Sequence, residues 1–336
     1  MRDAPILLIG GSGIVGRWTA KLLRDANPEA PLLIGGRDLG KAGQVAAEIS
    51  QAEGVAVDLG ADDLGLGDRS IGAVAIFLKD DRLAALRFAQ VRGVPHIGIS
   101  SGTFEIGPEV SAFIHHPRAA PVVLGSEWLA GAAVLATLHL ARKFARVTDI
   151  VIDAVLDEED IGGPAADIDM HRLTQLAPAA LTRREGNFHW RNGDEAKAVI
   201  RAVDGEAMEA FAYSPLDIAA LAAVTHAPNI QLNVSVGMSS NRRRGGPMST
   251  EIIITLSGKT PEGGPHRERH AIVHPQGQAP VTALGVAMML ERLTGLDGKP
   301  ATTAGVYFPE QLIDPDAYLR RLAAIGGSFT RMEDAR

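Results

Sequence analysis

Three glycines with the spacing G-x-G-x-x-G stand close to the N-terminus, in the run Gly11-Ser12-Gly13-Ile14-Val15-Gly16. An apolar stretch precedes them at residues 6–9, and residues 17–23 have the apolar spacing of a helix. A strand, a tight turn and a helix form the context in which this spacing binds the pyrophosphate of a dinucleotide. We expect Gly11 to permit the turn, Gly13 to let the backbone approach the phosphates, and Gly16 to let the helix pack on its strand. The sequence therefore predicts a phosphate site at Gly11, Ser12, Gly13, Ile14 and Val15, with the helix dipole favouring the negative charge.

The exit of the next apolar stretch, residues 30–36, should decide which nicotinamide cofactor fits. Arg37 is the first side chain after Gly36, and no acidic residue precedes it there. An arginine at this position accommodates the 2′-phosphate of NADP, whereas an acidic residue binds the ribose hydroxyl of NAD. Asp38 is expected to cap the helix at residues 39–50, but it could reach the ribose if the loop folds inward. The predicted cofactor is NADP, with NAD possible.

Later apolar stretches at residues 54–59, 71–79 and 95–102 alternate with helical segments, which is typical of a doubly wound parallel sheet. Ligands of such sheets bind beyond the carboxyl ends of the strands. The residues expected at these ends, besides the glycine run, are Gly36, Arg37, Asp58, Leu78, Lys79, Ser100 and Ser101. We predict that Asp58, Leu78 and Ser100 contact the cofactor.

Lys79 is the best-placed candidate for proton transfer, because it ends an apolar strand at the expected cofactor edge. A surface lysine followed by two solvated aspartates is the alternative. Ser101 is the second candidate, as a hydrogen-bond partner of the nicotinamide amide or the substrate, or else as a turn cap. Glu127 could act as an acid or base, but a carboxylate in the first turn of a helix is the simpler interpretation. Arg242 to Arg244 could hold a substrate carboxylate or be solvated.

The pattern changes after residue 147, where strand-like stretches follow one another and two helices, at residues 168–180 and 217–226, interrupt them. This predicts an inserted α+β domain with a mainly antiparallel sheet, and a hairpin loop at residues 241–247. The predicted division is a Rossmann domain of residues 1–125 and 275–336 and a substrate and dimerisation domain of residues 126–274. The helix at residues 281–293 should return to the first domain.

Composition excludes several classes of protein. The 336 residues are 46% hydrophobic and 22% charged, which indicates a globular chain of about two domains. The net charge of −7 argues against a nucleic-acid partner. The absence of cysteine excludes disulfides and cysteine nucleophiles, including thioester-forming dehydrogenases, and the histidine spacing indicates no metal site. No signal peptide or membrane span is recognised, so we expect a cytoplasmic protein.

Several segments resemble the saccharopine dehydrogenase-like oxidoreductases. The segments that carry the resemblance are residues 9–16, 36–37, 57–59, 93–102, 305–310, 314–315 and 322–326. The resemblance covers about the first 125 and the last 60 residues, and it implies a split Rossmann domain, NAD(P)-linked redox chemistry at a C–N bond or related centre, and often a dimer. The chain departs from the family at His96 and Gly98, where an acidic or aromatic residue is usual, and at Glu127-Trp128, where Pro-Gly is frequent. These departures lie near the expected substrate.

We therefore expect an NADP-dependent oxidoreductase that acts on a small imine, amino-acid-like or keto substrate and forms a homodimer. A non-enzymatic NADP-binding sensor or scaffold is the alternative. A short-chain dehydrogenase is excluded because it needs Tyr-x-x-x-Lys. The three tyrosines, Tyr213, Tyr307 and Tyr318, are followed four residues later by Asp217, Gln311 and Leu322.

Overall fold

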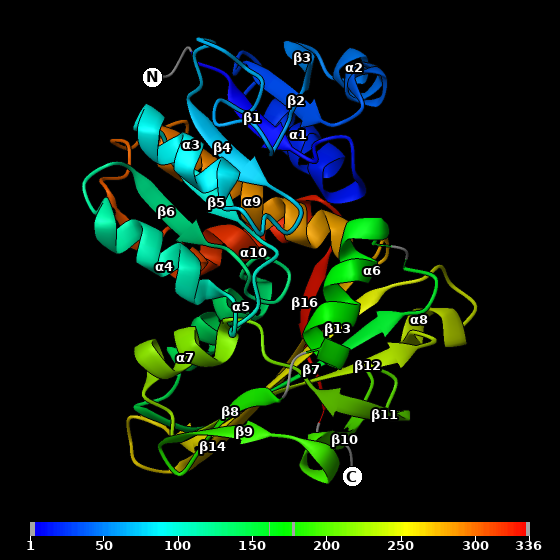
Figure 1. The fold of residues 1–336 in the computed structure, drawn as a ribbon. Helices are drawn as coiled ribbons and strands as arrows, with labels where there is room; N and C mark the ends of the chain where they lie inside the picture. Colours follow the sequence, from blue (N-terminus) through cyan, green and yellow to red (C-terminus); the bar gives the residue numbers. More distant parts are fainter. Residues whose placement is uncertain (1–3, 161, 177–178, 334–336) are drawn as a thin grey trace. The chain divides into compact units, whose positions relative to one another are not determined.

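The computed structural model describes residues 4–160, 162–176 and 179–333 and divides the chain into two compact units (Figure 1). Unit 1 comprises residues 1–126, 162–169 and 282–313, and unit 2 comprises residues 127–161, 170–281 and 314–336. In the part of the chain that the structure describes, no helix is both long and apolar enough to cross a membrane.

Unit 1 contains a seven-stranded sheet in the order β15-β6-β5-β4-β1-β2-β3, in which every neighbouring pair is parallel. The strands are β1 (Ile6–Ile9), β2 (Leu32–Gly36), β3 (Ala52–Ala56), β4 (Ala73–Ile76), β5 (His96–Gly98), β6 (Pro121–Leu124) and β15 (Gly305–Tyr307). The helices that join them are α1 (Ile14–Ala26), α2 (Leu39–Glu48), α3 (Ala84–Arg92) and α4 (Ile106–His115). The order 3-2-1-4-5-6 is that of a Rossmann sheet, and the predicted doubly wound parallel sheet is confirmed.

The core of unit 1 follows from strands that are apolar on both faces. All four residues of β1 are buried, as expected for a central parallel strand. Leu7 and Ile9 pack in one cluster with Val74 of β4 and Phe88 of α3. Lys79 lies three residues beyond the end of β4, so the predicted strand at residues 71–79 is shorter than expected and its polar end belongs to the loop.

Unit 2 is built on a mixed, mostly antiparallel sheet with the main path β10-β11-β12-β7-β13-β14-β16, and β8 and β9 attach through β12. The strands are β7 (Arg146–Asp157), β8 (Ala180–Arg184), β9 (Asn187–Arg191), β10 (Lys197–Arg201), β11 (Ala207–Ala212), β12 (Asn229–Gly237), β13 (Thr250–Lys259), β14 (Pro265–His274) and β16 (Ser328–Arg331). Only the β12–β7 pair is parallel among the main-path pairs of the described residues. The predicted α+β second domain is confirmed.

The remaining helices are α5 (Ala132–Ala141), α6 (Pro164–His171), α7 (Asp217–Thr225), α8 (Ser240–Arg243), α9 (Gln278–Thr294) and α10 (Pro315–Ala324), with the π-helix η1 (Arg172–Leu176) and the 3-10 turns η2 (Gly193–Ala196) and η3 (Pro309–Gln311). Residues 282–294 of α9 group with unit 1, as predicted for the returning helix.

Three expectations differ from the structure. The helix expected at residues 168–180 begins earlier, as α6, and gives way to η1 and then to β8; residues 177–178 lie outside the described residues. Residues 241–247 do not form a hairpin loop, because β12 and β13 both pair with β7, which lies between them. Residues 314–336 were expected with the first domain, but β16 pairs with β14 in the sheet of unit 2.

Candidate active site

The glycine turn between β1 and α1 has no room for side chains at two of its positions. A Cβ on Gly11 would lie 2.7 Å from the carbonyl oxygen of Leu8, and one on Gly16 would lie 2.6 Å from the Gly11 Cα. The left-handed residue is Gly10, with φ +84°, so it is Gly10 and not Gly11 that reverses the chain. Gly11 and Gly16 are instead required by close packing of the turn and the helix.

The start of α1 presents backbone N–H groups to an exposed site. Gly13 is the N-cap, and the first bond within the helix runs from Arg17 N to Gly13 O at 2.9 Å. The N–H groups of the three residues between them therefore precede the hydrogen-bonded turn. Gly13 and Ile14 are exposed, and the first turn contains no acidic residue. This arrangement fits a phosphate group, since the helix dipole is not already neutralised by a carboxylate.

The exit of β2 lies beside this turn. A Cβ on Gly36 would meet only Ser12 Oγ, at 3.6 Å, so the backbone here is open toward the turn. Arg37 is exposed, and its guanidinium has no hydrogen bond or ion pair with any residue that the structure describes. Asp38 caps α2 by accepting a hydrogen bond from Lys41 N at 3.1 Å. The expected capping role of Asp38 is thus confirmed, and Arg37 is left exposed at the strand end.

Two other predicted cofactor residues also follow strand ends. Leu78 lies against the turn, because a Cβ on Gly10 would be 3.1 Å from Leu78 Cδ2. Asp58 is exposed and accepts a hydrogen bond from Gly60 N at 2.7 Å, which forms a local turn after β3. In a sheet of this order, the connections reverse direction between β1 and β4, and ligands bind in the crevice at that point. Gly10 and Leu78 lie on the two sides of this position.

Lys79 and Ser101, predicted separately, are bonded to each other. Lys79 Nζ donates a hydrogen bond to Ser101 Oγ at 3.1 Å. Ser101 Oγ in turn donates to Oε1 of Glu109, on α4. Glu109 is 7% exposed, and its burial raises its pKa, although the Ser101 hydrogen bond and the charge of Lys79 oppose the shift. The result is a chain of three polar side chains that runs from the loop after β4 into the interior of unit 1.

Neighbouring residues fix this chain in place. Ser101 N donates to Ser126 Oγ at 3.0 Å, and Gly102 N donates to Glu105 Oε2 at 2.8 Å. Glu105 Oε2 lies 3.9 Å from Lys79 Nζ, so one carboxylate also compensates the ammonium charge. The loop after β5 is therefore held through the backbone of Ser101 and Gly102.

Two buried residues of β5 and its exit complete the candidate site. Ser100 is buried beside Ser101. His96 is 4% exposed, and burial lowers its pKa to about 4, so its imidazole is neutral at physiological pH. A Cβ on Gly98 would lie 3.5 Å from His96 Cε1, which is an ordinary van der Waals distance. The two positions that depart from the family pattern therefore lie within contact range of each other.

Sequence reasoning did not identify Glu109 or Ser126. The signal for Glu109 was weak, since a glutamate early in a helix is ordinarily explained by the helix dipole. Glu127 was expected in the first turn of a helix, but the structure places it elsewhere. It is 3% exposed and stands five residues before α5, so it is not a first-turn carboxylate. The next residue, Trp128, donates its backbone N–H to Asp217 Oδ2 at 2.6 Å within unit 2.

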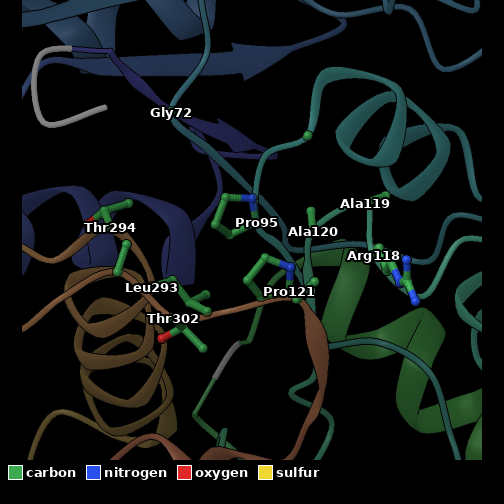
Figure 2. A pocket seen from close by; sticks show the side chains of 12 residues that line it. Gly72, Pro95, Arg118, Ala119, Ala120, Pro121, Leu293, Thr294 and Thr302 are labelled. Atoms are coloured by element: carbon green, nitrogen blue, oxygen red, sulfur yellow. The ribbon is translucent and has the colours of Figure 1, made fainter.

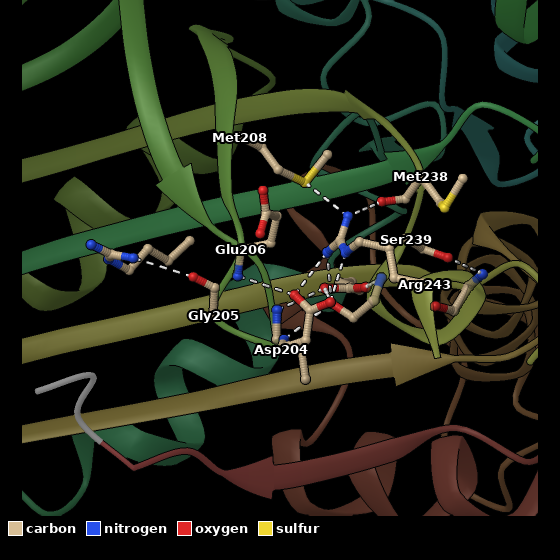
Figure 3. A network of polar contacts seen from close by, with 12 residues as sticks. Asp204, Gly205, Glu206, Met208, Met238, Ser239 and Arg243 are labelled. Carbon is tan, nitrogen blue, oxygen red and sulfur yellow. Dashed lines mark hydrogen bonds and ion pairs between the residues drawn. The ribbon is translucent and has the colours of Figure 1, made fainter. Parts of the chain in front are cut away.

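The arginines considered for a substrate carboxylate are ion-paired within unit 2. Arg242 Nη1 lies 2.6 Å from Asp157 Oδ1. Arg243 binds Asp204, with 2.6 Å from Nε to Oδ2, and also donates to the Met238 carbonyl oxygen (Figure 3). Hydrogen bonds from Arg243 lower the pKa of Asp204 to about 2. Through these contacts the guanidinium groups of Arg242 and Arg243 bind α8 to neighbouring segments of the chain. Arg244 is exposed.

A separate pocket of about 190 Å³ lies at the opposite edge of the parallel sheet (Figure 2). Gly72, Pro95 and Pro121, which line it, immediately precede or begin β4, β5 and β6 at their amino ends. The phosphate turn and Lys79 follow the carboxyl ends, so this pocket is distinct from the candidate site. Within the described ranges, no three histidine or acidic residues are grouped so as to hold a metal ion.

Comparisons with known proteins support the fold. No protein family matches the sequence, and no curated protein shows significant sequence similarity to it. Among solved structures, apo saccharopine dehydrogenase (L-Glu forming) from Saccharomyces cerevisiae aligns with a TM-score of 0.64 and 11% identity over 98% of this chain and 100% of that one. A myo-inositol dehydrogenase from Corynebacterium glutamicum aligns with a TM-score of 0.45 and 15% identity over 99% and 100% of the two chains. An oxidoreductase from Thermotoga maritima aligns with a TM-score of 0.47 and 11% identity over 98% of each chain. The chain therefore shares the fold of saccharopine dehydrogenase, and the predicted resemblance is confirmed at the level of fold.

Proposed function

We propose that this protein is an oxidoreductase that transfers a hydride between a nicotinamide cofactor and a small imine, amino-acid-like or keto substrate. One observation carries the proposal. The phosphate turn follows β1, Lys79 follows β4 and Ser101 follows β5, and these three strands are adjacent and parallel. The residues proposed for phosphate binding and for proton transfer therefore follow neighbouring strands at one edge of one sheet, which supports a nicotinamide enzyme.

We assign cofactor binding and proton transfer to different residues of the candidate site. The cofactor, when bound, supplies or accepts the hydride. The turn holds the pyrophosphate, and Leu78, Asp58 and Ser100 line the path of the remaining cofactor groups. Lys79, oriented by Ser101, delivers a proton to the substrate nitrogen or oxygen during reduction and removes it during oxidation.

We propose NADP as the preferred cofactor. Arg37 is exposed at the end of β2, and Asp38, the only acidic residue next to it, is engaged with the N-terminus of α2. A guanidinium there forms charge-assisted hydrogen bonds with a 2′-phosphate. The open backbone at Gly36 leaves space for that phosphate.

A cofactor-binding sensor or scaffold is the second candidate. The observation in its favour is that Lys79 and Ser101 are already hydrogen-bonded within unit 1, as purely structural groups would be. Turnover separates the two functions, because a sensor would bind NADPH without oxidising it.

The test combines binding with turnover in the purified full chain. Fluorescence titration with NADPH and NADH measures cofactor affinity, and a panel of 2-oxo acids, each with and without an amino acid or ammonia, measures NADPH oxidation. We expect micromolar binding and turnover with at least one member, with Lys79→Met abolishing turnover but not binding. Lys41→Met, which removes an exposed lysine of α2, is the matched control. Binding without turnover across the panel would favour the sensor, and absence of binding would contradict both functions.

We also propose that the chain forms a homodimer through unit 2. Several large apolar side chains of this unit are exposed, namely Phe188, Trp190, Val199, Val236 and Met238. Phe188 and Trp190 lie two residues apart on β9 and so on the same face of that strand, and adjacent exposed apolar side chains support an interface there.

A further inference from the structure

Glu109 forms the buried end of a directional chain of hydrogen bonds. A serine hydroxyl has one proton to donate, and Ser101 donates it to Glu109 while accepting a hydrogen bond from Lys79. Every link thus points from the ammonium toward the carboxylate. We propose that Glu109 is the proton acceptor of a relay from Lys79 through Ser101, which leaves the Lys79 amine neutral and able to act as a base. This inference rests on the proposed function, because it assigns the source of the proton chemistry at the same site.

The relay balances in protons and charge. One proton moves from Lys79 Nζ to Ser101 Oγ as the hydroxyl proton moves from Ser101 Oγ to Glu109 Oε1. An ammonium and a carboxylate become an amine and a carboxylic acid, and Ser101 is unchanged. During substrate oxidation, neutral Lys79 then accepts the substrate N–H or O–H proton as the hydride leaves for the nicotinamide. After oxidation Lys79 and Glu109 each hold a proton, and the substrate's proton leaves from the partly exposed Lys79 ammonium to water, which restores the neutral amine for the next turnover. Reduction follows the same path in reverse, with water supplying that proton to Lys79.

Burial of Glu109 favours movement of the proton in this direction. Glu109 is buried, and desolvation disfavours its charged form. Glu105 and Asp80 are the other acidic groups whose charges act on Glu109, and both also disfavour its ionisation, whereas the charge of Lys79 favours it. Transfer of the proton removes a charge from the interior, and Glu105 remains near Lys79 to stabilise the ammonium when it forms again.

Substitution by glutamine separates a relay from a structural link. The amide oxygen of a glutamine accepts the same hydrogen bond from Ser101, but it does not take up a proton at physiological pH. If Glu109 only anchors Ser101, Glu109→Gln should behave like the wild type. If Glu109 is the acceptor, Glu109→Gln should fold normally and lose the proton function.

The first measurement needs no substrate. Infrared spectra of the full chain, recorded without cofactor between about pH 4 and about pH 9, follow the C=O stretch of protonated carboxyl groups. In the wild type we expect a band that persists above the pH at which exposed glutamates ionise. The band should be missing in Glu109→Gln, and its frequency should shift in Ser101→Ala. In Lys79→Met the band should persist to higher pH, because the alternative state with an ammonium at Lys79 and a carboxylate at Glu109 no longer competes for the proton. Asp81→Asn, which removes an exposed carboxylate two residues from Lys79, should leave it unchanged.

The second measurement uses whichever substrate of the panel reacts. We expect Glu109→Gln to lower kcat by about ten- to a hundredfold with little change in KM, and to alter the pH profile of kcat. Wild-type kcat in Glu109→Gln would overturn the relay. So would the absence of a Glu109 carboxylic-acid band above about pH 5, or a band that titrates at the same pH in Lys79→Met. The infrared result does not depend on turnover. If the Glu109 band responds to Lys79→Met but the protein oxidises no NADPH, the proposed function is contradicted, whereas the proton transfer between Lys79 and Glu109 is not.

Discussion

Lys79 Nζ and Ser101 Oγ, 22 positions apart in the sequence, are joined by a hydrogen bond of 3.1 Å. The bond exists because β4 and β5 are parallel neighbours, so the loops that follow them leave the sheet at the same edge. Neither residue alone identifies a site, since an exposed lysine and a turn serine are both common. Their pairing, at the edge of the sheet that also holds the glycine turn, is the observation on which the proposed proton chemistry rests.

Gly13→Ala tests the phosphate turn. Gly13 is exposed at the N-cap of α1, and a methyl group there would stand 3.1 Å from Gly10 O and occupy space that the pyrophosphate needs. The φ of −76° is permitted for alanine, so the fold should be kept. We expect cofactor affinity to fall by at least about tenfold, equivalent to about 1.4 kcal/mol, in a fluorescence titration.

Gly43→Ala is the matched control for this change. Gly43 lies inside α2, and a Cβ there meets no atom within 4 Å. Alanine favours a helix interior over glycine by about 1 kcal/mol, so this variant should be slightly more stable and bind the cofactor normally. Equal affinity of Gly13→Ala and Gly43→Ala for NADPH would remove the turn from the phosphate site.

The parallel sheet of unit 1 could be predicted because its strands are buried on both faces. The residues of β1 and β4 are uninterrupted apolar runs; glycines follow β1 directly, and Lys79 follows β4 after Phe77 and Leu78. That local pattern predicts the strand type and the edge of the sheet at which ligands of such folds generally bind. It also allowed Arg37 and Lys79 to be placed at strand ends without any knowledge of strand order.

The pairing of distant strands in unit 2 could not be read in the same way. The segment at residues 241–247 has the length and glycine content of a hairpin loop, but β7 intervenes between β12 and β13. β16 was missed because it is short and mostly exposed, and only its pairing with β14 defines it as a strand. Non-local pairing of this kind depends on packing that no short stretch of sequence encodes.

The candidate site could be predicted only in part, because one of its residues is also brought there by a contact between segments that are separate in the sequence. Lys79 and Ser101 were identified from their positions after apolar strands. Glu109 was not, because α4 brings it to Ser101 only after the loop between them has folded. A buried carboxylate and an exposed one have the same appearance in a sequence, and only burial distinguishes their chemistry.

Asp160 should make stability depend on pH. Its Oδ2 accepts a hydrogen bond from Gln278 N at 2.7 Å, and burial raises its pKa to about 6 from 3.8. A carboxyl group with a raised pKa contributes stability when protonated, below about pH 4, and loses that contribution as the pH rises through 6. Asp160→Asn, which stays neutral and keeps an acceptor, should therefore be more stable than the wild type at pH 7 by about 1–2 kcal/mol after allowance for partial exposure.

Thermal unfolding at a series of pH values measures this difference. The Tm advantage of Asp160→Asn should be several degrees, at about 2–4 °C per kcal/mol, and should shrink as the pH falls from about 7 to about 4. Asp194→Asn, at a carboxylate whose side chain is 94% exposed, should show no such trend. A constant difference between Asp160→Asn and the wild type at every pH would show that the carboxyl group does not titrate in this range.

Sedimentation velocity tests the proposed homodimer. At micromolar concentration we expect a species of about twice the chain mass of 35.4 kDa. Replacing Phe188 and Trp190 together by serine removes two exposed apolar groups of β9 and should shift the equilibrium toward monomer without lowering the Tm. A wild-type chain that sediments as a monomer at these concentrations would rule out the interface.

The choice between NADPH and NADH is the prediction that depends most directly on one side chain. Arg37 is exposed after β2, and its guanidinium would form charge-assisted hydrogen bonds with a 2′-phosphate that NADH lacks. Such a contact contributes about 1.5–3 kcal/mol, which is about ten- to more than a hundredfold in affinity. We expect the wild type to bind NADPH more tightly by this factor, and Arg37→Ala to lose most of the preference while its NADH affinity stays nearly constant.

Two controls make the result specific. Arg87→Ala removes an exposed arginine from α3 and should leave both dissociation constants unchanged, which excludes a general effect of charge. Asp38→Ala removes the cap of α2 and should lower stability by about 1 kcal/mol without changing the cofactor preference. If Asp38→Ala instead weakens NADH binding, Asp38 reaches the ribose and the protein uses both cofactors. If the wild type prefers NADH, or Arg37→Ala keeps the preference for NADPH, Arg37 does not select the cofactor.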